Sequence, residues 1–224
     1  MALSKLMRYS NRSYLLENFL LCFQNSLLYQ FQKLFVLDKN HDNLHDYSLK
    51  SILNLVDQNT VNLVLYGNSF TKIKFIDKII NSYTIPIFYV DFDLLFSGYY
   101  ESGLIIKKSN ITILRPNEVD FVKIISELLQ KTATQQSIVI LDSLNGFHSI
   151  FNQMKDSGRF VDSLIMFLTC NLKFSNSKLF LISLSEKKEN QWVLSPIKRH
   201  ILEIENMNKF QIEESDSKIN IQIL

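Results

Sequence analysis

The stretch from Val61 to Asp93 constrains the fold more than any other, because it has the pattern of a strand, a turn, a helix and a second strand. Residues 61–66 form an apolar run of strand length that ends at Gly67. Residues 71–83 have isoleucines on one helical face, and residues 87–91 form a second apolar run. Such a unit predicts parallel strands covered by helices on both faces.

The rest of the chain repeats this alternation before the pattern changes. From Gln191 onward, apolar and polar residues alternate, which predicts a meander of antiparallel strands. We expect a three-layer α/β sandwich with a mostly parallel central sheet, in which 1–47 is an N-terminal helical segment and 48–224 is the core domain. The other expected helices span 12–36, 48–57, 117–131 and 159–174, and the other expected strands span 111–114, 137–142 and 177–184, with a glycine-containing loop before 111.

Composition limits the classes of function. The net charge of +2 and pI near 8.4 are too mild to indicate a polyanion partner by themselves. Polar residues interrupt the apolar stretch 14–37, so no uninterrupted run reaches the roughly 18 residues of a membrane span. The two cysteines, Cys22 and Cys170, lie far apart. We therefore expect a reduced, intracellular protein, cytoplasmic or nuclear, with no membrane partner.

The N-terminal segment leaves two interpretations open. Leucines and phenylalanines give the expected helix 12–36 a broad apolar surface, which would dock on its own domain or on a partner subunit. The polar stretch after it contains His41 and His45, each beside an aspartate. A spacing of four residues suits a metal pair only on a helix, and no third ligand completes the set. We predict a solvated loop there and no metal site.

The turn after the first core strand has the position of a phosphate-binding loop without its residues. A loop of the G-x-x-x-x-G-K-[ST] type needs its second glycine for close backbone approach, its lysine for charge and its hydroxyl for magnesium. When this pattern is laid on Gly67, those three positions hold Lys72, Ile73 and Lys74. The sequence therefore predicts the architecture of a nucleotide site with altered phosphate chemistry.

The ordered strand ends resemble the core of the RecA/RadA-type ATPases. In that family a strand resembling I-D-T-E-G-T-F follows the phosphate loop, and Asp93 and Phe96 fall at its Glu and Phe positions within YVDFDLLF, residues 89–96. The run IVILDSL, residues 138–144, is similar to the family's Walker B strand, which ends here in Asp142. The resemblance covers about residues 50–224 and includes the order of the later helix, strand and meander.

The resemblance implies roles for these residues. Asp93 would take the place of the Glu that activates water, and Asp142 the place of the Asp that acts on magnesium through water, as vestigial catalytic groups. The shorter Asp93 side chain would hold its carboxylate about one methylene further back. ATP with magnesium would be the cofactor if any is bound, although an unliganded site is expected. The candidate nucleotide-binding residues are Gly67, Thr71, Lys72, Lys74, Asp142 and Ser143.

Each of these residues also has a structural interpretation. Asp91, Asp93 and Asp142 would cap helices or pair with nearby lysines at the sheet edge. Lys72 and Lys74 would occupy a solvated first helical turn.

Two loops combine basic and aromatic residues, as single-stranded nucleic-acid sites do. Glu186 and Glu189 dilute the charge of the second loop, and two solvated loops are the alternative. The candidate nucleic-acid-binding residues are Phe147, Lys155 and Arg159 in the first loop and Lys187, Lys188, Trp192, Lys198 and Arg199 in the second.

The favoured hypothesis is a non-catalytic RecA-fold subunit that acts as a scaffold or regulator in an oligomer. It resembles the recombinase paralogues and the ATPase-like subunits of the Elongator complex. That resemblance implies homo- or hetero-oligomers with RecA-fold paralogues and a role related to nucleic acid, in DNA repair or tRNA modification. The alternatives are a nucleotide-binding ATPase with an unorthodox phosphate loop and a single-stranded nucleic-acid-binding module.

Overall fold

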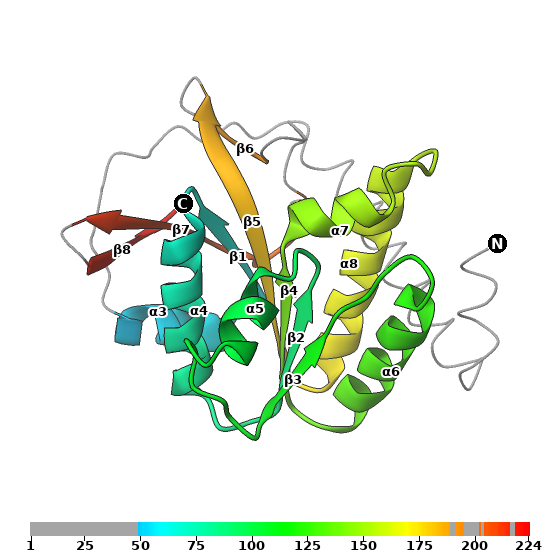
Figure 1. Ribbon diagram of the computed structural model, residues 1–224, viewed down its shortest axis with the longest axis horizontal. Coiled ribbons are helices and arrows are strands. Elements are labelled where there is room, and N and C mark those ends of the chain that lie inside the picture. The colour runs from blue at the N-terminus through cyan, green and yellow to red at the C-terminus, as the bar shows by residue number, and fades with distance from the viewer. Residues whose placement is uncertain (1–48, 189–190, 195–201, 203, 216–217) are drawn as a thin grey trace.

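The computed structural model describes residues 49–188, 191–194, 202, 204–215 and 218–224 (Figure 1). The expected helix 12–36, the stretch with His41 and His45, and the basic pair Lys198 and Arg199 lie outside these residues. All the helices and strands named below lie within the described residues.

Helices and strands alternate along most of the chain. The helices are α3 (Leu49–Gln58), α4 (Ser69–Ser82), α5 (Leu95–Glu101), α6 (Phe121–Thr134), α7 (Leu144–Ile150) and α8 (Ser157–Phe174). The strands are β1 (Val61–Tyr66), β2 (Ile87–Asp91), β3 (Ile111–Leu114), β4 (Ile138–Asp142), β5 (Lys178–Lys188), β6 (Gln191–Leu194), β7 (Asn208–Ser215) and β8 (Lys218–Ile223).

The sheet has the order β3-β2-β4-β5-β1-β7-β8, and β6 pairs with β5 outside this path. Strands β1 to β5 and β7 run parallel to their neighbours along it, whereas β8 is antiparallel to β7 and β6 is antiparallel to β5. The carboxyl ends of β1, β2, β4 and β7 therefore reach the same edge of the sheet. This edge, called the carboxyl edge below, holds the candidate site.

Helices cover both faces of the sheet, as the unalternated apolar strands predict (Figure 1). Val61, Leu63 and Leu65 of β1 pack on one face, in a core that also holds buried residues of α6, α7 and α8. Val64 and Tyr66 point the other way, into a second core with residues of α3, α4 and α5. The predicted three-layer α/β sandwich with a mostly parallel sheet is thereby confirmed at the level of architecture.

Three predictions about elements need correction. The segment before β3 contains the helix α5 as well as a loop, because Phe96 turns inward and stacks on Tyr89 of β2 with ring centroids 3.8 Å apart. The first loop proposed for nucleic acid contains the helix α7, which Ser143 caps by accepting a hydrogen bond from the Gly146 N–H. The meander is only partly antiparallel, since β7 adds parallel to β1 before β8 returns beside it.

Two further expectations concern the environment of the protein. None of the helices in the described ranges combines the length and apolar character needed to cross a bilayer. Cys170, on α8, is held in a disulfide bond, so the prediction that the cysteines are reduced is not met at this residue. Cys22, the other cysteine of the sequence, lies outside the described residues.

Candidate functional site

The connection between β1 and α4 is too short to wrap around a phosphate group. Strand β1 ends at Tyr66 and α4 begins at Ser69, so only Gly67 and Asn68 lie between them. Asn68 caps the helix, and its side chain accepts a hydrogen bond from the Phe70 N–H at 2.8 Å. A G-x-x-x-x-G-K-[ST] loop places several backbone N–H groups around a phosphate before its helix begins. Here the chain enters a capped helix directly.

Lys72 points from α4 into the protein. Its Nζ lies 2.9 Å from both carboxylate oxygens of Asp142 and 3.6 Å from Oδ2 of Asp93. Its side chain is fully buried. Burial by itself lowers the pKa of the Lys72 ammonium, but attraction to the Asp142 and Asp93 carboxylates outweighs burial and raises it. Lys72 is therefore a protonated lysine at neutral pH, and the predicted solvated position for it is wrong.

Asp142, at the end of β4, receives two kinds of donor. Besides the Lys72 ammonium, the Tyr89 hydroxyl donates a short hydrogen bond to its Oδ2. Burial raises the pKa of Asp142 to about 6, although attraction to Lys72 and the hydrogen bond from Tyr89 both act to lower it. The carboxyl is thus mainly ionised at neutral pH and is bound to groups of its own chain. The predicted pairing of Asp142 with a nearby lysine describes this arrangement.

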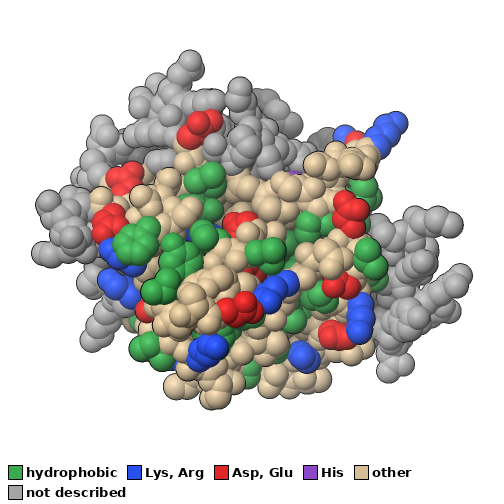
Figure 2. Space-filling view, in the orientation of Figure 1, with side chains coloured by type: hydrophobic (Ala, Val, Ile, Leu, Met, Phe, Trp, Pro, Cys, Tyr) green, Lys and Arg blue, Asp and Glu red, His purple; other side chains and the backbone are tan. Residues whose placement is uncertain are grey.

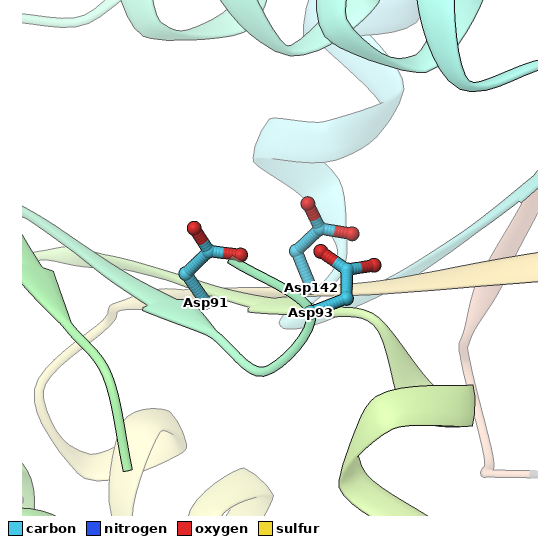
Figure 3. Close-up of side chains that lie close together, drawn as sticks. All are labelled: Asp91, Asp93 and Asp142. Carbon is cyan, nitrogen blue, oxygen red and sulfur yellow. The ribbon is translucent and has the colours of Figure 1, made fainter. Parts of the chain in front are cut away.

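Three carboxyl groups converge at this edge (Figure 3). One oxygen each of Asp91, Asp93 and Asp142 lies within 4.8 Å of the others. Asp91 and Asp142 are buried, and Asp93 is partly exposed on the turn after β2. The cation among them is the Lys72 ammonium, so we assign no metal ion to these carboxylates. Asp91 and Asp142 lie close together because β2 and β4 are neighbouring parallel strands in which these two residues are in register.

Asp91 is bonded on one oxygen only. Its Oδ2 accepts hydrogen bonds from the N–H and the hydroxyl of Ser97, at 2.7 and 2.5 Å. The Ser97 hydroxyl in turn accepts from Nε of Arg115 at 2.8 Å. The other carboxylate oxygen of Asp91, Oδ1, is buried and has no hydrogen-bond partner. Burial raises the pKa of Asp91, and the nearby Asp93 acts in the same direction.

The other candidate residues of the phosphate loop are bound to Glu214 of β7. The Thr71 hydroxyl donates to its Oε2 at 3.3 Å, and Lys74 Nζ lies 2.6 Å from its Oε1. Lys74 also lies over the Phe70 ring, 4.3 Å from the centroid. The hydrogen bond from Lys74 lowers the pKa of Glu214. The hydroxyl and ammonium groups predicted to meet a nucleotide thus meet carboxylates of the same chain.

Gly67 and Ser143 complete the predicted nucleotide set. Gly67 is exposed beside the capped start of α4, and a Cβ added to it would meet nothing within 4 Å. Ser143 is buried and caps α7, where its hydroxyl accepts a hydrogen bond from the Gly146 N–H at 3.2 Å. Burial, countered by Lys72, raises the pKa of Tyr66 to about 12, so its hydroxyl stays protonated. Ser143 thus has a local structural role at the start of α7.

The first predicted nucleic-acid loop loses its aromatic residue. Phe147 is fully buried and stacks on Phe92 with ring centroids 4.6 Å apart, which corrects the expectation that it stacks on a base. Its ring also lies near the rings of Phe121 and Phe151, in the core between the sheet and helices α6, α7 and α8. Lys155 and Arg159, near the start of α8, are exposed.

The second predicted nucleic-acid patch stays a prediction. Lys187 pairs with Trp192 across the hairpin of β5 and β6, and Lys188 is the next residue of β5. On the face shown in Figure 2, positive and negative side chains are interspersed over the described residues. This mixture agrees with the small net charge of +2.

Sequence reasoning missed the residues that close the site. Tyr89 had a detectable signal, because it lies two positions before Asp91 and so shares its face of β2. Glu214 had none, since it lies 140 residues from Lys74 in a segment expected to be a meander.

The arrangement has the character of a structural ion-pair network. Every ionised group that points inward at the carboxyl edge, within the described ranges, meets an opposite charge or a hydrogen-bond donor, apart from Oδ1 of Asp91. Comparison with known protein families finds no family model that matches the chain, and comparison with curated proteins finds no significantly similar sequence.

Proposed function

We propose that this chain is a non-catalytic RecA-fold subunit that serves as a scaffold or regulator in an oligomeric assembly, formed with itself or with a RecA-fold paralogue. The observation that carries the proposal is the buried Lys72, whose ammonium lies against Asp142 where a catalytic site would need a metal and a phosphate. A group that is already paired and buried has little to gain from a nucleotide.

The short turn before α4 supports the same conclusion. With Asn68 accepting from the Phe70 N–H, the first donors of the helix are partly satisfied before any phosphate arrives. Thr71 and Lys74 would have to leave Glu214 to reach one. The intact three-layer architecture around such a site favours a role in which the fold serves as a binding platform.

Calorimetric titration of ATP and ADP, with magnesium, into the purified protein tests the non-catalytic part. We expect no binding heat at millimolar nucleotide. Micromolar binding that Asp142→Asn abolishes would refute the proposal and favour the ATPase alternative. Binding that survives this substitution would indicate a different nucleotide site and would equally contradict a subunit that works without nucleotide.

The assembly part needs a separate measurement. Sedimentation velocity at increasing protein concentration is expected to show self-association, or purification from the native source is expected to yield a stable complex with a second RecA-fold protein. A chain that remains monomeric and carries no such partner would contradict the scaffold role, whatever the nucleotide result.

A further inference from the structure

Lys72 connects three separate segments of the chain at the carboxyl edge. The ammonium belongs to α4, Asp142 belongs to β4, and Asp93 belongs to the turn between β2 and α5. Within the described residues, no other ion pair joins these segments to one another. A positive centre held by carboxylates from different segments is the arrangement that proteins use to hold a divalent metal ion.

The charges at this edge exceed what one ammonium neutralises. Three carboxyl groups lie within 4.8 Å of one another, and two of them are buried. The Asp91 Oδ1 atom is buried, has no donor, and belongs to this same group of carboxylates. Such an unmatched oxygen is costly to bury. Without Lys72 these carboxylates would have no lysine among them, so its removal would leave them able to take up a divalent ion.

We propose that the Lys72 ammonium is a built-in replacement for a metal ion, which holds α4, β4 and the β2–α5 turn together without any bound cation, and that its removal leaves a site for a divalent cation. This inference deepens the proposed function. The contacts of Lys72 carry it, and only its relevance to a non-catalytic subunit rests on that proposed function. It implies that the shape of the carboxyl edge does not depend on metal or nucleotide.

The groups that face the ammonium agree with this role. Tyr66 of β1 presents its ring 5.2 Å from Lys72 Nζ, and Tyr89 of β2 donates to Asp142. Neither phenol carries a negative charge at neutral pH, because burial raises the pKa of both hydroxyls. Among the described residues, the anions around Lys72 are therefore the carboxylates of Asp142 and Asp93, and attraction to them keeps the ammonium protonated.

The test is a metal-rescue experiment. Thermal unfolding is followed for the wild type, Lys72→Met and Lys72→Met/Asp142→Asn, each with millimolar Mn²⁺ or with EDTA. Methionine removes the charge while filling a similar volume. We expect Mn²⁺ to raise the Tm of Lys72→Met by roughly 5–10 °C, the size that a ligand near 100 times its Kd produces in a domain of this length. The wild type and the double variant are expected to shift by less than about 1 °C.

Lys74→Met is the matched control, because it removes a lysine from the same helix whose partner, Glu214, stands outside the carboxylate group. Its Tm is expected to be insensitive to Mn²⁺. A wild-type protein stabilised by Mn²⁺, or a Lys72→Met variant without metal dependence, would overturn the proposal. These outcomes are independent of the nucleotide titration and of the assembly measurement.

A second measurement covers the case in which Lys72→Met does not fold. Hydrogen exchange of the wild type is compared with and without Mn²⁺ in the segment 92–101, which contains Asp93 and α5. A built-in cation predicts the same exchange in both conditions. Slower exchange with Mn²⁺ would show that a metal ion competes for this site in the natural protein and would refute the replacement.

Discussion

A double-mutant cycle on Lys72 and Asp142 tests the central contact of the candidate site. The two charges lie 2.9 Å apart in the interior. With an effective dielectric constant of about 20, Coulomb's law gives an attraction of about 6 kcal/mol, from which the loss of hydration of both groups must be subtracted. Removing one partner leaves the other buried and unpaired, which costs about 3–5 kcal/mol in comparable cases.

The expected results follow from what each variant leaves behind. Asp142→Asn keeps an acceptor for Tyr89 but leaves the Lys72 ammonium with Asp93 alone, 3.6 Å away. We expect it to lower the free energy of unfolding by about 3 kcal/mol or more and the Tm by roughly 10 °C. Lys72→Met should cost somewhat less, because Asp142 can take up a proton when its cation is gone.

The cycle is completed by Lys72→Met/Asp142→Asn, which contains neither charge. We expect a coupling energy of about 3 kcal/mol from urea unfolding at pH 7. The partly exposed pair Lys74 and Glu214 is the control, with an expected coupling below about 1 kcal/mol. A coupling below about 0.5 kcal/mol for Lys72 and Asp142 would refute the reasoning. So would an Asp142→Asn variant of normal stability, which is what a purely catalytic carboxylate predicts.

Three further predictions concern the surroundings of this pair. The folded-state pKa of Asp142 is raised to about 6 from 3.8, so the folded chain holds this proton more tightly than the unfolded chain does. The contribution of Asp142 to the free energy of unfolding therefore falls as the pH rises from about 4 to about 6, and it is constant above pH 6. Subtracting the urea-unfolding profile of Asp142→Asn isolates this contribution, and a difference profile that rises over that range would contradict the sign. Tyr89→Phe removes a donor to a charged oxygen and should lower the free energy of unfolding by about 1.5–3 kcal/mol, whereas a change below about 0.5 kcal/mol would mean that the hydroxyl is not engaged. Gly146→Ala should lower the free energy of unfolding by about 1–3 kcal/mol, because its new Cβ would lie 2.8 Å from Cβ of Phe92. The control Gly98→Ala, whose Cβ would meet nothing within 4 Å, should raise the free energy of unfolding by about 0.5 kcal/mol. Equal effects of the two variants in calorimetric unfolding would disprove this packing argument.

The local sequence pattern predicted the bounds of those helices and strands whose structure depends mainly on their own residues. Strand β2 has the bounds expected for it, and β4 and α8 differ from their expected bounds by one or two residues. Their strong apolar runs have few alternative structures. Helix α5 was missed because its apolar residues are interrupted by Ser97 and Gly98, and the inward position of Ser97 depends on Asp91. Helix α7 was missed because its seven residues are too few for a periodic pattern to stand out.

The sequence by itself determined the layered architecture and the convergence of carboxylates at the carboxyl edge. Unalternated apolar strands must be covered on both faces, and the ends of parallel strands meet at one edge. Only the tertiary structure decided the state of Lys72. A lysine in a first helical turn is solvated unless an anion lies across from it, and Asp142 is 70 residues away in the chain. The same holds for Lys74 and Glu214, whose meeting depends on β7 lying beside β1. Charge pairing across the sheet is a property of distances in space, which local sequence pattern does not contain.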